Sequence, residues 1–433
     1  MQIINWPSLS DVEQKQVLNR SPLINEGSVE TQVSDIISQV IDKGDVALKA
    51  FNQQFDQYDT ADLRLSDVQI AQACSNVTQN VKAAIAQAMA NIETFHQAQT
   101  FKPVDVETQA GVRCELRCEA IERVGLYIPG GTAPLISTVM MLALPAKIAG
   151  CDKRVLVSPP PINDAIIYAA NACGITDIYQ VGGAQAIAAL AFGTDSIPQV
   201  DKIFGPGNRF VTEAKRLVSQ DNRISVAIDM PAGPSEVLVI ADDQANPQFI
   251  AADLLSQAEH GPDSQVMLVT TSAKQADAVN QALATQLEAL PRKEIAEQAL
   301  TCSRSFIVKD LKQAARVSNQ YGPEHLIIQS AKPREVLTDI RAAGSVFLGA
   351  YTPESVGDYA SGTNHVLPTY GYSRNYSSLS LADFSRRFTV QELTPQGLAG
   401  LGEAVMTLAE NELLDAHKNA VAIRLNELKQ SVQ

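Results

Sequence analysis

The sequence predicts an α/β protein built on parallel sheets, and three observations lead to that fold class. Between residues 123 and 242, short apolar and β-branched runs alternate with amphipathic helical segments. A second series of the same kind runs from residue 247 to about residue 349. Several runs end in a Gly-rich turn that leads into a helix, which is typical of repeated strand–helix units. Strands that alternate with helices pair in parallel, so we expect a parallel sheet from each series.

Length, charge and cysteine content bound the class of protein. A chain of 433 residues is too long for one simple core and suggests roughly two to three domains. The net charge of −14, without a Lys/Arg cluster, argues against nucleic acid as a partner. The N-terminus has no targeting pattern, and no run of about 18 apolar residues is long enough for a membrane span. We therefore expect a cytoplasmic protein that does not bind membranes, with its six scattered cysteines reduced.

The strands of the two series follow in order along the chain. The first series predicts strands in GLYIP, RVLVSPP, DIYQV, KIF, ISVAID and VLVIAD. The second predicts strands in QVMLVT, SFIVK, HLIIQ and SVFLG.

The two ends of the chain are expected to be helical. Residues 28–99 have a helical pattern and should pack on one of the two sheets, although the pattern does not say which. Residues 395–428 predict two helices, one ending near residue 409 and one beginning at Glu412, with Asn411 as a possible N-cap. Residues 351–376 hold five of the ten tyrosines among Gly, Ser, Asn and Pro, and we interpret them as an ordered, functional irregular loop.

Four of the five histidines lie in the C-terminal half, each within two residues of a carboxylate or amide side chain: His260, His325, His365 and His417. One such histidine alone is more often structural, but four together suggest a metal site. The strongest local pattern is Gln257 with His260, which end a predicted helix that Asn246 and Pro247 begin. Residues three apart lie on one helical face, so both side chains could meet one ion. A solvated helix end is about equally compatible with this spacing.

The other histidines have weaker local patterns. In YGPEH, Glu324 and His325 begin a predicted strand, where neighbours point to opposite sides and could flank a substrate, with His325 accepting a proton and Glu324 polarising a water. An exposed turn explains the pair about as well. Asp358 lies near His365 in the irregular loop. Glu412 and His417 are five apart on the last predicted helix, so they do not share one face and could contact different parts of a ligand, although a plain surface helix is a strong alternative.

Three Gly-rich turns precede predicted helices: PGGTAP, VGGAQA and FGPGN. Backbone amides at the start of a helix can bind phosphate. None of the turns completes the G-x-G-x-x-G pattern of dinucleotide-binding folds. A nucleotide site is therefore compatible with the spacing but is not established by it.

Eight segments stand in one order between about residues 123 and 425: GLYIPGGTAP, VGGAQAIAALAFGT, IFGPGNRFVTEAK, IDMPAGPSE, LLSQAEHGPDS, YGPEHL, SVGDYASGTNHVLPT and LLDAHKNAV. Together they resemble the motifs of the histidinol dehydrogenase family, and eight in order are far more specific than any one. The resemblance implies two incomplete Rossmann-like parallel-sheet domains, a helical N-terminal part and a helical C-terminal tail used in dimerisation. An incomplete Rossmann-like fold also explains the missing third glycine.

The resemblance further implies domain boundaries. Residues 1–22 would form an N-terminal arm. Residues 23–122 and 236–378 would form a first α/β domain with the metal and catalytic residues, and residues 123–235 a second, NAD-binding domain. Residues 379–433 would form the dimerisation tail of a homodimer with shared active sites, in which Glu412 and His417 complete the partner's site.

The activity implied by the resemblance is the two-step oxidation of L-histidinol through a bound aldehyde to L-histidine, with two NAD reduced in turn and one zinc per subunit. The implied metal ligands are Gln257, His260, Asp358 and His417, which would also contact the substrate. His325 would be the base and a substrate contact, and Glu324 would activate the water that adds to the aldehyde. Further substrate contacts would be Ser235 and Glu412, and NAD contacts Tyr127, Gln185 and Asn208. His365 would have a supporting role.

Two other readings stay open on the residues alone. A zinc hydrolase or lyase would use the same Gln, His, Asp and Glu side chains to activate water, but it leaves the Gly-rich half unused. A non-catalytic scaffold would use the histidines structurally and the acidic surface for a protein partner.

Overall fold

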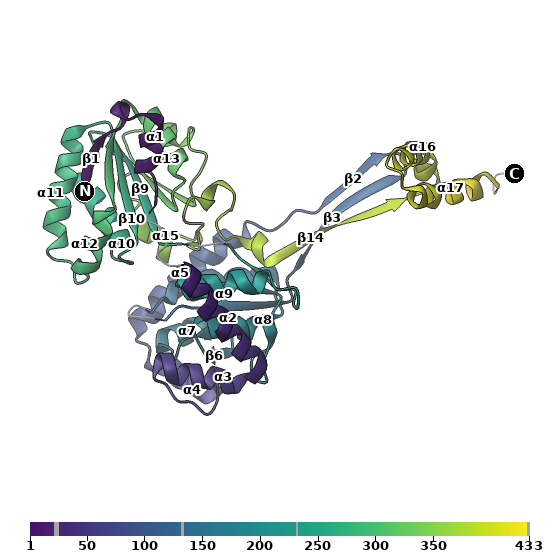
Figure 1. Cartoon of the computed structure of the whole chain (residues 1–433), viewed down its shortest axis with the longest axis horizontal. Helices are drawn as coiled ribbons and strands as arrows, with labels where there is room; N and C mark the ends of the chain where they lie inside the picture. Colours follow the sequence, from purple (N-terminus) through teal and green to yellow (C-terminus); the bar gives the residue numbers. More distant parts are fainter. Residues whose placement is uncertain (21–25, 131–133, 231–232, 431–433) are drawn as a thin grey trace. The chain divides into compact units, whose positions relative to one another are not determined.

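The computed structural model describes residues 1–20, 26–130, 134–230 and 233–430 (Figure 1). The chain divides into two compact units, one of residues 1–99 with 121–384 and one of residues 100–120 with 385–433. The larger unit contains two parallel sheets, which confirms the expected α/β class. The expected boundary between residues 22 and 23, and parts of the segments PGGTAP and MPAGPSE, lie outside the described residues.

A six-stranded parallel sheet in the larger unit has the order β1-β11-β10-β9-β12-β13. Its strands are β1 (Gln2–Asn5), β9 (Glu236–Ala241), β10 (Gln265–Thr270), β11 (Arg304–Ile307), β12 (His325–Gln329) and β13 (Ser345–Leu348). Strands β10 to β13 are the four predicted from the second series, and β9 is the last strand predicted from the first series, which here joins the other sheet. Strand β1, which pairs with β11, was not expected. Strands β9, β10 and β12 are buried throughout, as expected of parallel strands covered on both faces.

Helices cover both faces of this sheet (Figure 1). One face carries α10 (Pro247–Ala258), α11 (Ala273–Leu287) and α12 (Lys293–Thr301); the other carries α1 (Asp11–Val17), α13 (Leu311–Tyr321), α14 (Pro333–Leu337) and the 3-10 turn η1 (Trp6–Ser8). Alternate side chains of β9 point to opposite faces. Val237 therefore packs in the core with α10, and Leu238 in the core with α13.

A five-stranded parallel sheet has the order β6-β5-β4-β7-β8. Its strands are β4 (Arg123–Tyr127), β5 (Lys153–Ser158), β6 (Ile178–Gln180), β7 (Lys202–Phe204) and β8 (Ala227–Ile228), all predicted from the first series; its helices are α6 (Ile136–Ala149), α7 (Asp164–Ala172), α8 (Gly183–Phe192) and α9 (Arg209–Ser219). The chain starts at β4, builds outward to β6 and then returns to β7 on the other side of β4. The strand order therefore reverses between β4 and β7, where open α/β sheets usually bind ligands.

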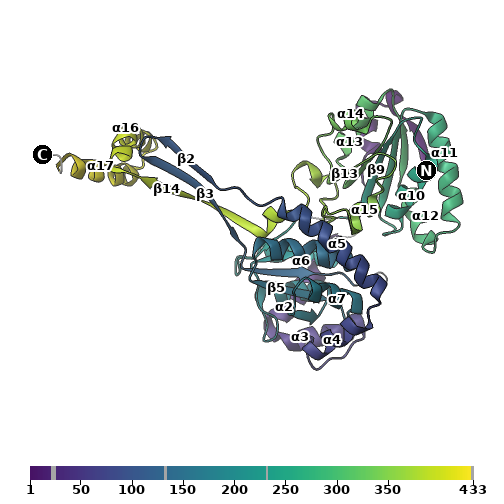
Figure 2. The same cartoon turned by 180° about the vertical axis from the view of Figure 1, so that it is seen from behind.

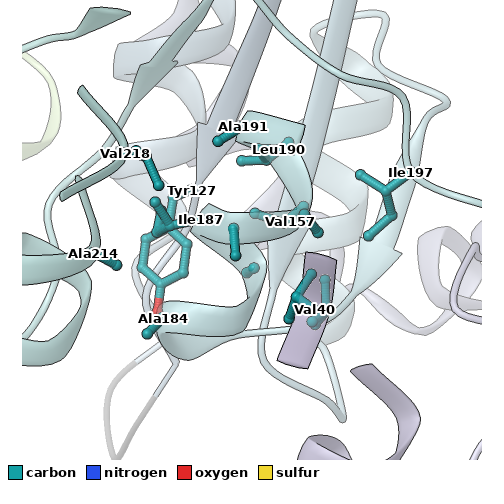
Figure 3. Close-up of a cluster of buried hydrophobic side chains, with 14 of the residues drawn as sticks. Val40, Tyr127, Val157, Ala184, Ile187, Leu190, Ala191, Ile197, Ala214 and Val218 are labelled. Atoms are coloured by element: carbon teal, nitrogen blue, oxygen red, sulfur yellow. The ribbon is translucent and has the colours of Figure 1, made fainter. Parts of the chain in front are cut away.

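The N-terminal helices pack on this second sheet. They are α2 (Glu26–Lys43), α3 (Asp45–Phe51), η2 (Asn52–Asp56), α4 (Asp67–Asn76) and α5 (Gln79–Gln97). Helix α2 lies on α8 and α9, where Val40 shares a buried cluster with Ile187 and Leu190 (Figure 3). Helices α4 and α5 lie beside α7 and α6 (Figure 2). These N-terminal helices therefore contact the helices of residues 123–235, whereas the expected domains group residues 23–122 with residues 236–378.

The smaller unit is an antiparallel ribbon with two helices. Its elements are β2 (Val104–Gln109), β3 (Val112–Ala120), β14 (Ser385–Leu393), α16 (Pro395–Asn411) and α17 (Asp415–Gln430), with the strands in the order β14-β3-β2. The two helices were expected, but none of these strands was. The second helix begins three residues later than expected, and Asn411 is the last residue of α16 and does not cap α17.

The expected irregular loop contains short ordered turns. They are α15 (Glu354–Tyr359) and η3 (Tyr372–Arg374), followed by η4 (Leu381–Phe384). Helix α15 is important below because it carries two carboxylates. Within the described parts of the chain, no helix combines the length and the apolar character that a membrane crossing requires.

Candidate active site

Strand pairing brings three of the predicted site residues to one edge of the six-stranded sheet. His325 begins β12 and lies opposite Val237 of β9, so Glu324 and Ser235, just before the two strands, lie at the same edge. This is the amino edge, whereas sites of α/β folds usually lie at the carboxyl edge. Helix α10 follows β9 and runs back along the sheet, so its C-terminal end reaches the amino edge as well.

The sequence specifies helix α10 closely. The Asn246 side chain accepts a hydrogen bond from the backbone N–H of Gln248, and Pro247 occupies the first turn, as predicted. The predicted apolar stripe is buried: Ala251, Leu254, Leu255 and Ala258. The helix ends at Ala258, so His260 lies beyond its last turn and not on one helical face with Gln257. Gln257 is buried and His260 is exposed.

A candidate metal centre forms at the end of α10. Ligand atoms of His260, Glu354 and Asp358 all lie within 4.8 Å of one another. Glu354 and Asp358 are four residues apart on α15, so both point from one helical face. An imidazole and carboxylate oxygens are donors that Zn²⁺ accepts, and the C-terminal end of a helix favours a cation. The donor set therefore fits the metal that the resemblance implies.

Glu354 is a site residue that the sequence analysis did not include. The Glu354 side chain is buried. Both polar atoms of the Gln257 amide are satisfied when the amide nitrogen donates to the Glu354 carboxylate, at 3.1 Å from Oε2. In that orientation the Gln257 oxygen faces away from the carboxylate. The signal was present in PESVGDY, where a glutamate precedes Asp358 by one helical turn. It was missed because that segment was interpreted as an irregular loop.

Glu324 and His325 lie next to the metal centre and are buried, which excludes the exposed turn. The Nδ1 atom of His325 lies 3.6 Å from Oε2 of Glu324, so the two side chains are close and do not point apart as expected. The same Nδ1 hydrogen bonds to the backbone oxygen of Glu236 at 3.0 Å. Nε2 of His325 makes no hydrogen bond among the described residues and lies 3.6 Å from Oδ1 of Asp358. This buried nitrogen is thus available to a ligand at the centre.

Burial and mutual charge shift the ionisation of these groups. Desolvation raises the pKa of Glu324 to about 7 and that of Glu354 to about 8. Burial opposes the charged form of His325, but Glu354, Glu324 and Asp358 outweigh it and raise the imidazole pKa well above its ordinary value. A divalent cation bound by the same carboxylates would lower the pKa of His325 and so oppose the rise that the carboxylates cause.

His365 connects the loop to the second sheet. Its Nδ1 hydrogen bonds to the backbone oxygen of Asp358 at 2.8 Å, and its Nε2 to Oγ1 of Thr138 at 3.2 Å. Both ring nitrogens are therefore occupied by groups that hold the loop. The supporting role of His365 stays a prediction.

The three residues expected to contact NAD lie around the switch point of the five-stranded sheet. Tyr127 ends β4 (Figure 3). Its buried hydroxyl accepts a hydrogen bond of 3.2 Å from the N–H of Gly183 at the start of α8. Gln185 is buried in the first turn of α8. Asn208 is exposed and caps α9, accepting from the N–H groups of Phe210 and Val211. Helix α8 follows β6 and α9 follows β7, and Gly183 at the start of α8 and Gly205 before α9 both contact Tyr127. Backbone amides at such helix N-termini suit an anionic ligand.

The segment FGPGN is fixed beside Tyr127 by close backbone packing and a buried ion pair. A Cβ at Gly205, whose φ is +124°, would lie 2.1 Å from the carbonyl oxygen of Tyr127, so only glycine fits there. Lys215 and Asp229 form an ion pair with both side chains buried. Lys215 donates to the Gly205 oxygen at 2.9 Å, and Asp229 accepts from the Gly205 N–H at 2.8 Å.

Glu412 and His417 belong to the smaller unit. Glu412 follows the end of α16, His417 lies in α17, and both are exposed. They are therefore not on one helix, contrary to the expectation. Within their own unit they have no carboxylate or histidine cluster around them among the described residues.

Comparisons with known proteins agree over nearly the full length. The family model described as histidinol dehydrogenase matches residues 19–425. Histidinol dehydrogenase of Shewanella oneidensis is 72% identical, with 99% of this chain and 100% of that protein covered. The protein of the same name from Escherichia coli K12 is 58% identical, with 99% and 98% covered. A crystal structure of histidinol dehydrogenase from Elizabethkingia anophelis superposes with a TM-score of 0.95 at 46% identity, over 99% of each chain.

These matches cover both units and all eight segments that carried the resemblance. They confirm the expected family and with it an oxidoreductase. On its fold, its length and its sequence, the chain belongs to the histidinol dehydrogenase family.

Proposed function

We propose that the chain is a zinc-dependent, NAD-linked enzyme that oxidises L-histidinol through L-histidinaldehyde to L-histidine. The observation that carries the proposal is the meeting of His260, Glu354 and Asp358 ligand atoms within 4.8 Å beside the buried pair Glu324 and His325. A metal centre next to a potential base is what the oxidation of a nitrogen-rich alcohol needs. The names of the relatives support the choice of histidinol as substrate.

Gln257, His260 and Asp358 would hold the zinc together with His417 of a second copy. Zinc bound there would anchor the amino and imidazole nitrogens of the substrate and so orient its hydroxyl-bearing carbon. Glu354 would orient the Gln257 amide through the hydrogen bond described above. Ser235, at the same sheet edge, and Glu412 of the second copy would contact the substrate.

His325 would accept the hydroxyl proton of histidinol while a hydride passes from the hydroxyl-bearing carbon to NAD. This step yields the aldehyde and NADH. Glu324 would then take a proton from a water that adds to the aldehyde carbon. The resulting hydrate would lose a second hydride to a second NAD and give the carboxylate. Burial supports these roles, because it raises the pKa of Glu324 to about 7 and so makes its carboxylate a stronger base than an exposed one.

Tyr127, Gln185 and Asn208 would contact NAD at the switch point between β4 and β7. NAD bound there would accept the hydride in each step. The helix N-termini of α8 and α9 supply backbone amides of the kind that bind a pyrophosphate. Both oxidations need the same acceptor, so one NAD site used twice is sufficient.

The active unit would be a homodimer in the cytoplasm. The smaller unit carries exposed apolar side chains on its ribbon and helices, of which Val106, Leu408, Leu413 and Ile423 are examples. A second copy would cover such a surface. The described residues contain no disulfide, and reduced cysteines would suit this compartment.

The test is a stoichiometric assay with purified, zinc-loaded protein. Histidinol and excess NAD should give two NADH per histidinol, followed at the absorbance of NADH, together with histidine as the product. One NADH per histidinol would mean release of the aldehyde and would remove the role of Glu324. No NADH at all, with metal-dependent hydrolysis of another substrate, would replace the proposal by the hydrolase reading.

A further inference from the structure

A buried network joins the N-terminal segment to the two residues proposed for catalysis. Arg20 and Glu236, 216 residues apart, form a two-pronged ion pair in which Nη2 of Arg20 donates to Oε2 of Glu236 at 2.9 Å. Their side chains are only 12% and 2% exposed. Taking two charges out of water is costly, so a buried pair of this kind is weak evidence for stability alone.

The main chain of Glu236 contacts both proposed catalytic residues. Its N–H donates to Oε2 of Glu324 at 2.8 Å, and its carbonyl oxygen is 3.0 Å from Nδ1 of His325. A single residue therefore sets the position of one Glu324 oxygen and the tautomer of His325, whose Nδ1 must carry the proton to donate to a carbonyl. In the neutral imidazole, Nε2 then has the lone pair that can accept a proton.

Arg20 also holds the turn that leads to Glu324. The same Nη2 donates to the carbonyl oxygens of Tyr321 at 3.0 Å and Gly322 at 3.3 Å. Its guanidinium carbon lies 3.9 Å from the centre of the Tyr321 ring. The backbone N–H of Tyr370 donates to Oε1 of Glu236 at 3.1 Å and closes the network from the opposite side.

We infer that Arg20 and Glu236 are positioning residues for the oxidation, which lock the Glu236 main chain and the turn of residues 321–322 so that Glu324 and His325 keep their working geometry. Arg20 suits this task because its planar fork satisfies a carboxylate and nearby carbonyls at once, which a lysine ammonium does not. The inference rests on the roles proposed for Glu324 and His325. Neither Arg20 nor Glu236 belongs to the proposed metal ligands.

The test compares Arg20→Ala and Arg20→Lys with Arg341→Ala as a matched control. Arg341 also donates to main-chain carbonyls in the same sheet domain, those of Thr338 and Ile340, but contacts no site residue. Both Arg20 variants should keep zinc content and the KM for histidinol and lose kcat in both oxidation steps, by about 100-fold for Arg20→Ala, since small misplacements of reacting groups have effects of this size. Arg341→Ala should keep the wild-type kcat.

Two further measurements separate positioning from a general structural role. Guanidinium at a non-denaturing concentration should restore part of the kcat of Arg20→Ala, because the truncated side chain leaves a site of its own shape. In a double-mutant cycle for the second step, Arg20→Ala should add little to the loss caused by Glu324→Gln, because Arg20 acts through that residue. Fully additive losses, or no rescue by guanidinium, would overturn the inference.

The outcomes also distinguish the inference from the proposed function. If Glu324→Gln and His325→Asn keep the wild-type kcat, the proposed catalytic roles fail and the inference fails with them. A second outcome is that Glu324→Gln and His325→Asn lose turnover, but Arg20→Lys and Arg20→Ala fold, bind zinc and keep the wild-type kcat. In that case only the inference fails. Arg20→Lys serves in place of Arg20→Ala if the truncation does not fold.

Discussion

The side-chain nitrogen of Gln257 donates a hydrogen bond of 3.1 Å to Oε2 of Glu354 when both polar atoms of the amide are satisfied. An amide has its oxygen opposite its nitrogen, so this contact decides which way the oxygen faces. Glu354 also lies 4.0 Å from Nδ1 of His325. One buried carboxylate therefore links a proposed metal ligand to the proposed base.

Glu354→Gln should weaken zinc binding. A glutamine at 354 can offer its own nitrogen to Gln257 and turn the amide oxygen out of its working orientation. The apparent zinc affinity should fall by about 10- to 100-fold, as for other residues that orient metal ligands. Competition with a chromogenic chelator measures it. Glu335→Gln, at an exposed ion pair with Lys332, is the control; equal affinities for Glu354→Gln and wild type would show that Glu354 does not orient a ligand.

Glu324→Gln should slow the second oxidation more than the first. The amide cannot take a proton from the water that adds to the aldehyde, whereas the first step uses His325 as the base. Single-turnover experiments started from histidinol and from histidinaldehyde would separate the two rates. A loss of about 100- to 10,000-fold is expected in the second step, the range of general base catalysis. Equal losses in both steps would contradict the assignment.

Mixed dimers should recover activity if His417 completes the site of a second copy. Subunits with His417→Ala and subunits with Asp358→Ala are each expected to be inactive. After refolding together, one site of each mixed dimer would have all four proposed ligands. About a quarter of wild-type activity should then return at equal amounts, because roughly half of the dimers are mixed and each has one intact site. Absence of recovery at every mixing ratio would argue against shared sites.

Lys215→Met should destabilise the five-stranded sheet domain and loosen the segment FGPGN. The substitution leaves the buried Asp229 without its partner, and an unpaired buried charge costs about 3–5 kcal/mol. Urea unfolding measures this loss, and the KM for NAD should rise while that for histidinol stays the same. Arg223→Ala at the exposed pair with Asp221 should cost less than about 1 kcal/mol. A similar small loss for Lys215→Met would refute the prediction.

Asp253→Asn should stabilise the protein above neutral pH. Burial raises the pKa of Asp253 from 3.8 to about 7, and Gln329 donates a hydrogen bond to it at 2.7 Å. Because the pKa of Asp253 is higher in the folded than in the unfolded state, its contribution to the free energy of unfolding is fully present below pH ~4. This contribution is lost as pH rises from there through ~7. Asparagine removes the loss, so the variant should gain about 1–3 kcal/mol over wild type at pH 8 and much less at pH 4.5, measured by urea unfolding. A gain that does not depend on pH would rule out this cause.

The sequence by itself determined the local elements. Ten of the eleven strands of the two parallel sheets were predictable because buried parallel strands are continuous apolar runs. Helix α10 was predictable from Asn246, Pro247 and its apolar stripe. The eight ordered segments were sufficient to indicate the family. The exposed strands β2 and β14 carry no such pattern, which is why the antiparallel ribbon was not predicted.

The tertiary structure alone decided which side chains meet. No local pattern could pair Arg20 with Glu236, or bring His260 to Glu354, because such contacts depend on which strands become neighbours and where each helix returns along the sheet. The strand order places β9 beside β12. The main chain of Glu236 therefore hydrogen bonds to both Glu324 and His325. Periodicity reports the burial of single elements, whereas a site is built from several elements whose packing follows from the shape of the whole core.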